Sequence, residues 1–322
     1  MKADVDTCTK VAMRFMAVQR VAPHGITHPF GDERSVHQAF PAAIPKEQAD
    51  PFLMCDYFDA VESTGKASHE DEFPVNWHPH RGFDIASYLR SGTGRHADSL
   101  GNRETYETPG MQWMSTGSGV EHAEGGANDK GQRVQGFQIW VNVPADKKME
   151  DPRYGTVPTK DLPLVQVNSG VKARVLAGEA WDVTGPFRTT QSVQMIDFEL
   201  DSAASATMEV TNGLDTVMVY VYEGSLTRLN SKETIPTGSV VLLDASSDDV
   251  RGLELVATDA EGGAKALLFA GKKLKEPVAW HGPIVMNTQQ QIQHTFQELR
   301  SGSFPPKRVD WDYKSFASQP KV

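Results

Sequence analysis

Residues 83–89 read FDIASYL and are followed at residues 91–94 by SGTG. The first stretch has the strand-like alternation of apolar and polar positions that is typical of a β-strand with one buried face. The Gly-containing tetrad after it is typical of a tight turn. Together they predict a strand that ends in a turn, and the same unit recurs along the chain.

Three further stretches share this strand-like pattern: GFQIWVNV at 136–143, VQMIDFEL at 193–200 and TVMVYVY at 216–222. Turn sequences separate such stretches, as at residues 109–110, 117–119, 212–213 and 236–238. Short strands at this spacing predict an all-β protein made of sandwiches or barrels. Two sets of strands flank residues 144–163, a polar interval with four prolines, which we interpret as the connection between two domains.

One helix is predicted near the end of the chain, over residues 288–300. Ile292, Phe296 and Leu299 fall at helical spacing there. Asn287 or Thr288 can cap its start, and Gly302 can end it.

The composition excludes several classes of protein. Of 322 residues, 39% are hydrophobic and 23% are charged, which indicates an ordinary globular protein rather than a disordered one. The net charge of −10 and the lack of a Lys/Arg-rich face argue against direct contact with nucleic acid or an anionic membrane. We expect no signal peptide and no membrane span. With only Cys8 and Cys55 present, a reducing compartment is expected, the cytoplasm or, in a eukaryote, also the nucleus.

Two pairs of metal-ligating residue types stand out: His78 with His80, and His122 with Glu124. Side chains at positions i and i+2 of a strand point to the same face. Two such strands facing each other inside a barrel would bring three imidazoles and one carboxylate to one point. A single pair of this kind is more often surface or core histidine, but its recurrence favours a metal site.

The surroundings of these pairs add two expectations. Pro79 cannot donate a ladder hydrogen bond, so it predicts a strand edge or a bulge. We expect an apolar wall around the ligands, formed by Trp77, Phe83, Trp113 and Met114. Three nitrogens and one oxygen suit one divalent transition metal; Fe(II) is the expected ion, and Mn, Ni, Cu, Co or Zn are the alternatives.

The residues around the pairs resemble the pirin family of cupin proteins. The resemblance rests on these segments: QAF at 38–40, DPFLM at 50–54, WHPHRGFD at 77–84, QWMSTGSGVEHAE at 112–124, QIWVN at 138–142 and EPVAWHGPIVMNT at 276–288. The sequence departs from the family at Asp84, where many relatives have Glu. It also differs from the family at residues 95–98, RHAD, which keep a His and an acidic residue but not a common family sequence.

Pirins are bicupins, so the resemblance implies two tandem cupin barrels (double-stranded β-helix or jelly-roll) followed by a helix. We expect an N-terminal metal-binding barrel over residues 1–147. A C-terminal barrel without metal is expected over residues 160–322, including the closing helix at 288–300. No histidine lies between Ala123 and Trp280, which excludes a second site of the same kind. The resemblance also implies that the helix clamps the two barrels together; the alternative is that it caps its own barrel.

The family's metal ligands carry over to His78, His80, His122 and Glu124, the set that the spacing proposes. The implied function is a quercetin 2,3-dioxygenase-like oxidoreductase that uses O2 to open the ring of a flavonol or a similar small aromatic enol. Glu124 would be the catalytic proton acceptor. The leading alternative is a non-enzymatic, metal- or redox-sensing binding protein that modulates a transcription factor or metabolic enzyme. A sugar-binding or seed-storage cupin is a third reading, which the specificity of the pirin segments disfavours. We expect a monomer.

Several residues near the pairs keep two readings. Arg81 can form a salt bridge at the barrel rim or contact substrate. Gln112 and Trp113 are expected to fill the core rather than line a cavity. His281 is expected to pack or hydrogen-bond rather than bind metal.

Overall fold

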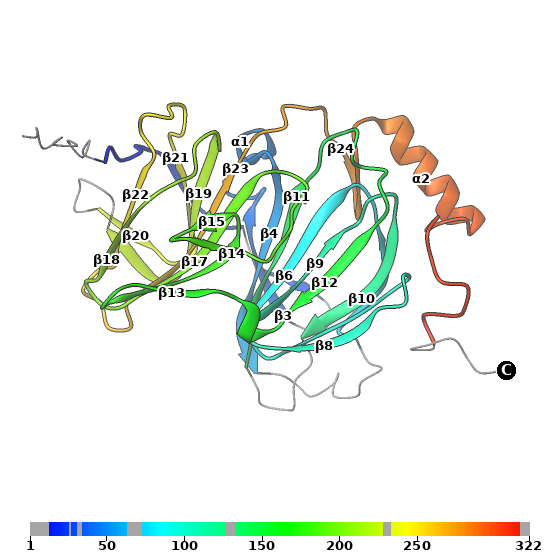
Figure 1. Ribbon diagram of the computed structural model, residues 1–322, viewed down its shortest axis with the longest axis horizontal. Helices are drawn as coiled ribbons and strands as arrows, with labels where there is room; N and C mark the ends of the chain where they lie inside the picture. Colours follow the sequence, from blue (N-terminus) through cyan, green and yellow to red (C-terminus); the bar gives the residue numbers. More distant parts are fainter. Residues whose placement is uncertain are drawn as a thin grey trace, which may run out of the picture.

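A computed structural model describes residues 13–25, 27–30, 34–62, 73–126, 133–227 and 233–315. Strands dominate these residues, and the one long helix among them lies near the C-terminus. Figure 1 shows two β-barrels side by side, with helix α2 at the outer end of the first. The predicted all-β fold with two barrels and a C-terminal helix is confirmed. Cys8 lies outside the described residues.

The first barrel contains a seven-stranded and a four-stranded antiparallel sheet. The seven strands are, in spatial order, β12 (Arg153–Val157), β9 (Gly110–Ser115), β6 (Phe83–Ser91), β11 (Arg133–Asn142), β4 (Phe52–Glu62), β3 (Arg34–Phe40) and β2 (Thr27–Phe30). The four strands are β5 (Val75–His80), β10 (Val120–Gly126), β7 (Thr93–Asp98) and β8 (Arg103–Glu107). A single helical turn, α1 (Lys46–Ala49), precedes β4.

The second barrel is built on an eight-stranded sheet. Its strands are β1 (Val18–Pro23), β21 (Ser239–Leu243), β19 (Thr216–Thr227), β23 (Ala264–Gly271), β17 (Val193–Leu200), β14 (Val171–Ala177) and β13 (Leu164–Asn168), with β20 (Thr234–Pro236) paired to β19. Two short pairs complete it, β15 (Glu179–Ala180) with β16 (Val183–Thr184) and β18 (Ser205–Glu209) with β22 (Gly252–Val256).

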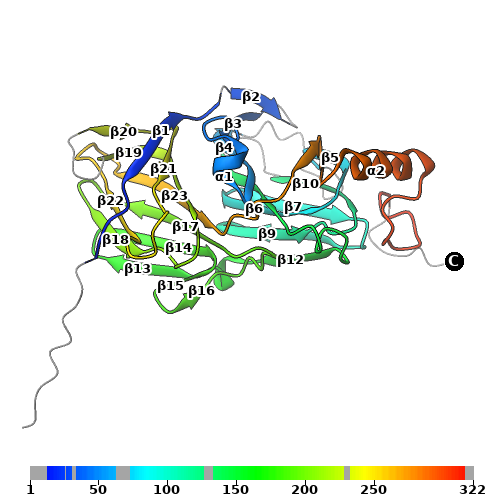
Figure 2. The same ribbon diagram turned by 90° about the horizontal axis from the view of Figure 1, so that it is seen from above.

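The positions of two strands, β1 and β12, were not predicted from the sequence. Strand β1 pairs with β21, so the first described strand of the chain belongs to the second barrel (Figure 2). Strand β12 pairs with β9 of the first barrel and lies within residues 144–163, which were predicted to be a connection. Only the short 3-10 helix η1 (Thr159–Asp161) and its neighbours then link the barrels in that interval. The division into domains of residues 1–147 and 160–322 stays a prediction. Strand β1 differs from it, because this strand lies in a sheet of the second barrel.

The two barrels share one hydrophobic core. Phe269 of the second barrel packs edge-on against Phe40 and Phe52 of the first, with ring centroids 5.1 and 5.4 Å apart. Beside this core, Arg90 donates to the buried carboxylate of Asp197 at 2.6 Å across the barrel boundary. A continuous apolar seam with a buried ion pair joins the barrels more tightly than a flexible linker would.

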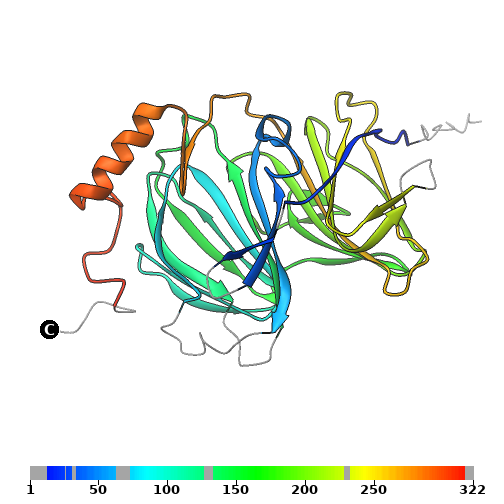
Figure 3. The ribbon, with the colours of Figure 1, turned by 180° about the vertical axis from the view of Figure 1, so that it is seen from behind.

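The predicted helix is confirmed as α2 (Gln289–Ser301), capped by Thr288 and ended by Gly302 in the left-handed conformation. Its buried residue Ile292 packs on the hairpin formed by β24 (Ala279–His281) and β25 (Ile284–Met286). Figure 3 shows the helix at the end of the first barrel that is remote from the second. The helix does reach the first barrel, as expected, but it does not lie between the barrels, so the predicted clamp is wrong.

The hairpin docks where β5 turns into β6. The backbone N–H of Val285 donates to the Arg81 carbonyl at 3.0 Å. Gly82 has φ +89°, and a Cβ there would lie 2.1 Å from the Val285 carbonyl oxygen. Glycine at this position therefore permits both the turn and the close approach.

Buried Arg81 connects the same turn to α2. Its guanidinium donates to Thr295 Oγ1 at 2.8 Å and to the Glu298 carboxylate at 2.5 Å. Of the two readings of Arg81, the structure supports the salt bridge. No helix in the described part of the chain has the length and apolar character needed to cross a membrane.

Candidate metal centre

Strand β10 carries the site residues between two neighbours, β5 and β7. In the β-ladder, His122 lies directly opposite His78 of β5, and Glu124 lies directly opposite His96 of β7. Directly opposite residues project to the same face of a sheet. Strand β5 is an edge strand of this sheet, as Pro79 predicted.

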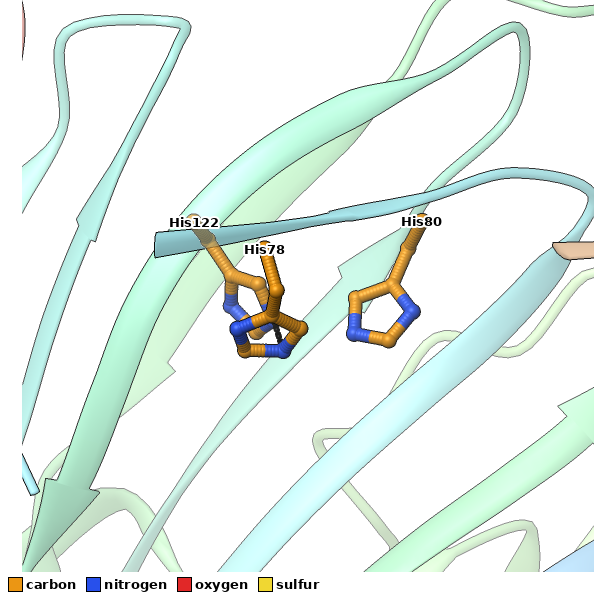
Figure 4. A group of neighbouring side chains, drawn as sticks. All are labelled: His78, His80 and His122. Carbon is orange, nitrogen blue, oxygen red and sulfur yellow. Dashed lines mark hydrogen bonds between the residues drawn. The ribbon is translucent and has the colours of Figure 1, made fainter. Parts of the chain in front are cut away.

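The three predicted histidine ligands come together on this face. Figure 4 shows the imidazoles of His78, His80 and His122 pointing into one space. The Nε2 atoms of His78 and His122 are 2.9 Å apart, and one nitrogen from each of the three rings fits within a 4.8 Å group. His80 and His122 are buried, whereas His78 is half-buried at the edge.

Two of these rings have their tautomer set by backbone carbonyls. His78 Nδ1 lies 2.7 Å from the Asn76 carbonyl oxygen, and His80 Nδ1 lies 3.2 Å from that of Pro283. A carbonyl accepts, so Nδ1 carries the hydrogen in both rings and Nε2 keeps its lone pair. His80 Nε2 is buried and has no hydrogen-bond partner among the described residues. This is the state of an imidazole that binds a metal through Nε2.

Burial also favours the neutral form that a metal requires. The pKa of His80 is well below its usual value because burial disfavours the imidazolium and because His78 is close. The pKa of His122 is lowered in the same way, by burial first and then by the neighbouring histidines.

The carboxylate of Glu124 lies beside the histidines, with Oε1 3.9 Å from His122 Nε2. It accepts hydrogen bonds from Ser87 Oγ at 3.0 Å, from Gln138 Nε2 at 2.7 Å and from Gln112 Nε2. These donors come from strands β6, β11 and β9 of the facing sheet. Gln112, predicted to fill the core, thus touches the site, and its role depends on a contact between sheets that a local pattern does not contain.

The sequence reasoning missed His96, which lies beside Glu124 and His122 and is fully buried. One ligand atom from each of His96, His122 and Glu124 fits within a second 4.8 Å group. A signal existed: His96 and Asp98 form a third pair at i and i+2, like the two pairs that were recognised.

The apolar wall differs in part from the prediction. Phe83 packs edge-on against His80 with ring centroids 5.4 Å apart, as expected. Trp140 packs on His80 in the same way at 5.2 Å and was not predicted. Trp77 instead faces Tyr313 of the C-terminal segment, and Trp113 faces Phe187. Of the predicted wall, Phe83 is confirmed beside His80, and Met114 belongs to the same hydrophobic cluster, against which Trp140 packs.

Both groups of metal-ligating residues found in the described part of the chain lie in the first barrel. In the C-terminal half, His281 is exposed and its ring packs against Phe296 with centroids 5.1 Å apart. That contact is of the packing kind expected for His281.

Comparisons with known proteins match both barrels to family models. Residues 33–141 match the model described as Pirin, and residues 195–305 match the model described as Pirin C-terminal cupin domain. A pirin-like protein of Caulobacter vibrioides is 34% identical over 278 residues, which are 86% of this chain and 95% of that protein.

Solved structures include similar folds. Quercetin 2,3-dioxygenase from Acinetobacter baumannii superposes with a TM-score of 0.78 at 28% identity, covering 90% of this chain and 99% of that one. A bacterial pirin from Escherichia coli, solved in complex with nickel(II), has a TM-score of 0.56 at 20% identity, covering 79% of this chain and 99% of that one. The second likeness supports the fold alone.

Proposed function

This chain belongs to the pirin family of two-barrel cupin proteins, and from that premise we propose that it is a metal-dependent dioxygenase of the quercetin 2,3-dioxygenase type. Its substrate would be a flavonol or a similar small aromatic enol, together with O2. The likeness to the Acinetobacter baumannii quercetin 2,3-dioxygenase supports this reaction class.

One observation carries the proposal. The imidazoles of His78, His80 and His122 form one group on a single sheet, and Glu124 lies beside them, with Oε1 3.9 Å from His122 Nε2. We propose His78, His80, His122 and Glu124 as the metal ligands. Three nitrogens and one oxygen suit Fe(II) and also Mn, Ni, Cu, Co or Zn, so the residues fit such an ion. A bound ion of this kind would supply a Lewis acid for the substrate oxygen and a redox partner for O2.

The remaining chemistry falls to the chain's own residues. The proton of the substrate hydroxyl would pass to a carboxylate oxygen of Glu124, which leaves the substrate as the enolate. Gln112, Gln138 and Ser87 hold that carboxylate in place through their hydrogen bonds. A positioned carboxylate of this kind contributes on the order of 10²–10⁴ to a rate. Phe83 and Trp140 cover His80 and would keep water from this side of the site.

The test is anaerobic reconstitution of the full chain with Fe(II), followed by oxygen uptake with and without quercetin. We expect quercetin-dependent uptake that His122→Ala removes. His294→Ala is the matched control, because His294 is an exposed histidine on α2 outside the site. Tight Fe(II) binding without any quercetin-dependent uptake would contradict this reaction and favour the metal-sensing alternative.

A further inference from the structure

Three strands of the metal-binding sheet carry the same kind of pair. Strand β5 has His78 and His80, and β10 has His122 and Glu124. Strand β7 has His96 and Asp98, and the ladder places His96 directly opposite Glu124 and Asp98 directly opposite His122. Six side chains of metal-site chemistry therefore form a continuous array on one face, of which the ligand set uses four.

The His96 ring has one nitrogen engaged and one free. Its Nε2 lies 3.0 Å from Asp98 Oδ2. Asp98 also accepts from the backbone N–H groups of Leu100 and Asn102, at 2.9 and 3.0 Å, and from the Asn102 amide at 2.8 Å. With these donors Asp98 acts as an acceptor, so Nε2 of His96 carries the hydrogen and Nδ1 keeps the lone pair.

That lone pair is buried and unused. His96 Nδ1 has no hydrogen-bond partner among the residues that the structure describes, and the side chain is fully buried. The ring is held by stacking on Tyr154, with centroids 4.0 Å apart and planes 11° from parallel. A carboxylate that orients a histidine whose other nitrogen is free is the usual outer support of a metal ligand. A purely structural His96–Asp98 contact would leave the buried Nδ1 unexplained.

The two groups of ligand atoms differ in chemistry and share one residue. The outer group has three histidines, and its His78 is half-buried. The inner group, His96, His122 and Glu124, is fully buried and has two histidines and a carboxylate. Two histidines and one carboxylate are the set that Fe(II) oxygenases use, whereas imidazole ligands suit Zn, Cu, Fe and Ni alike.

We propose that His96 is a fifth protein donor, and that the centre offers one divalent transition metal two overlapping positions. The outer position is that of the proposed function, in which Glu124 completes the histidine group of His78, His80 and His122, and the inner one uses His96, His122 and Glu124. Both positions need His122, and we take one ion to occupy one of them at a time. This inference rests on the metal site of the proposed function and adds an inner ligand to it.

The test removes the outer position and asks whether His96 then holds the metal. Metal-free full-length protein is titrated anaerobically with Co(II), whose visible absorption reports its ligands. We expect His78→Ala to bind one Co(II) per chain with an altered spectrum. Adding His96→Ala to His78→Ala should weaken Co(II) binding by at least about tenfold further. Adding His294→Ala instead is the control and should change nothing.

A second variant guards against a folding defect. In the His78→Ala background, Asp98→Asn keeps the size of the carboxylate but allows its amide to donate to Nε2, which moves the hydrogen of His96 to Nδ1. We expect the same loss of Co(II) affinity, with the melting temperature of the metal-free protein as the folding check. If both double variants bind Co(II) as His78→Ala does, His96 is not a donor and the proposal fails.

The outcome is separable from that of the proposed function. Absence of quercetin-dependent oxygen uptake in a protein that binds Co(II) through His96 would sink the reaction and leave the inner position standing. Quercetin-dependent oxygen uptake in a protein whose Co(II) binding does not depend on His96 would support the reaction and contradict the inner position. A wild-type chain that binds no Co(II) would overturn both.

Discussion

His122 and His78 face each other across strands β10 and β5 with their Nε2 atoms 2.9 Å apart. Because Nδ1 of His78 donates to the Asn76 carbonyl, its Nε2 can only accept. The hydrogen between the two rings therefore belongs to His122, whose own Nδ1 lies buried without a partner among the described residues. Metal binding through both Nε2 atoms requires His122 to exchange tautomer, so His122 is the ring most altered by loading.

The metal content of the chain should depend on His122. We expect elemental analysis to find close to one metal per chain, and His122→Ala to abolish it, because His122 belongs to both groups of ligand atoms. The exposed His294→Ala should leave the content unchanged. Two metals per chain, or normal content in His122→Ala, would contradict a single centre.

Glu124→Gln should show whether metal retention and turnover need the charge of Glu124 or only its size. Glutamine keeps the size but cannot accept the proton, and its amide would face the donors of Gln112 and Gln138. We expect weaker metal retention and a loss of turnover of about 10²–10⁴-fold. Glu121→Gln makes the same change on the same strand but on its opposite face and is the matched control. Full turnover by metal-loaded Glu124→Gln would show that Glu124 is neither base nor required ligand.

The pH dependence of metal retention follows from the buried rings. The pKa values of His80 and His122 are lowered from the usual 6.5, mainly by burial, so both rings stay neutral below pH 6.5. Protons then compete with the metal for these two rings only at still lower pH. Equilibrium dialysis from pH 7.5 downward should show retention through pH 6.5 and release below it. A release midpoint above pH 6.5 would contradict the lowered pKa values.

The same rings affect the stability of the metal-free protein. Below pH 6.5 the unfolded chain binds protons that the folded rings of His80 and His122 do not. The free energy of unfolding should therefore fall as the pH drops from 6.5, and His80→Gln should reduce that dependence. Urea unfolding of both proteins across this range measures it; equal slopes would exclude His80 as a contributor.

Two phenylalanines should distinguish what α2 and the shared core each hold together. Phe296 on α2 is half-buried, so Phe296→Ala should lower the free energy of unfolding by about 1–3 kcal/mol, less than for a fully buried ring. It should leave the barrels joined. Phe269→Ala, at the seam against Phe40 and Phe52, should cost about 3–5 kcal/mol. Limited proteolysis should cut within residues 144–163 only in Phe269→Ala. Cleavage there in Phe296→Ala would show that α2 also holds the barrels together and would contradict this assignment.

What the sequence predicted correctly is local in origin. The helix was predictable because Thr288, Gly302 and the apolar spacing act within a few residues of one another. Strand periodicity predicted that His78 and His80 share one face, but their strand lies beside that of His122 in one sheet rather than facing it as expected. Pro79 indicated an edge strand because the missing N–H is a property of that residue itself.

What was missed depends on partners far along the chain. Strand β1 pairs with β21, more than 200 residues away, and no local pattern encodes that register. The role of Gln112 depends on the distance between two sheets, and the place of Trp140 depends on which side of β11 faces His80. His96 was missed although its pair has the right spacing, because residues 95–98 differ from the residues usual in the family.

The path of the chain between the barrels also sets an order of events during synthesis. Among the described elements, the first, β1, belongs to the second barrel, and the last, α2, lies on the first. The carbonyl of Pro283 that fixes the His80 tautomer is made more than 200 residues after His80. A nascent chain that has completed the strands of the first barrel still lacks this carbonyl and the hairpin that covers Gly82. We therefore expect metal capture to follow the docking of this hairpin onto the first barrel.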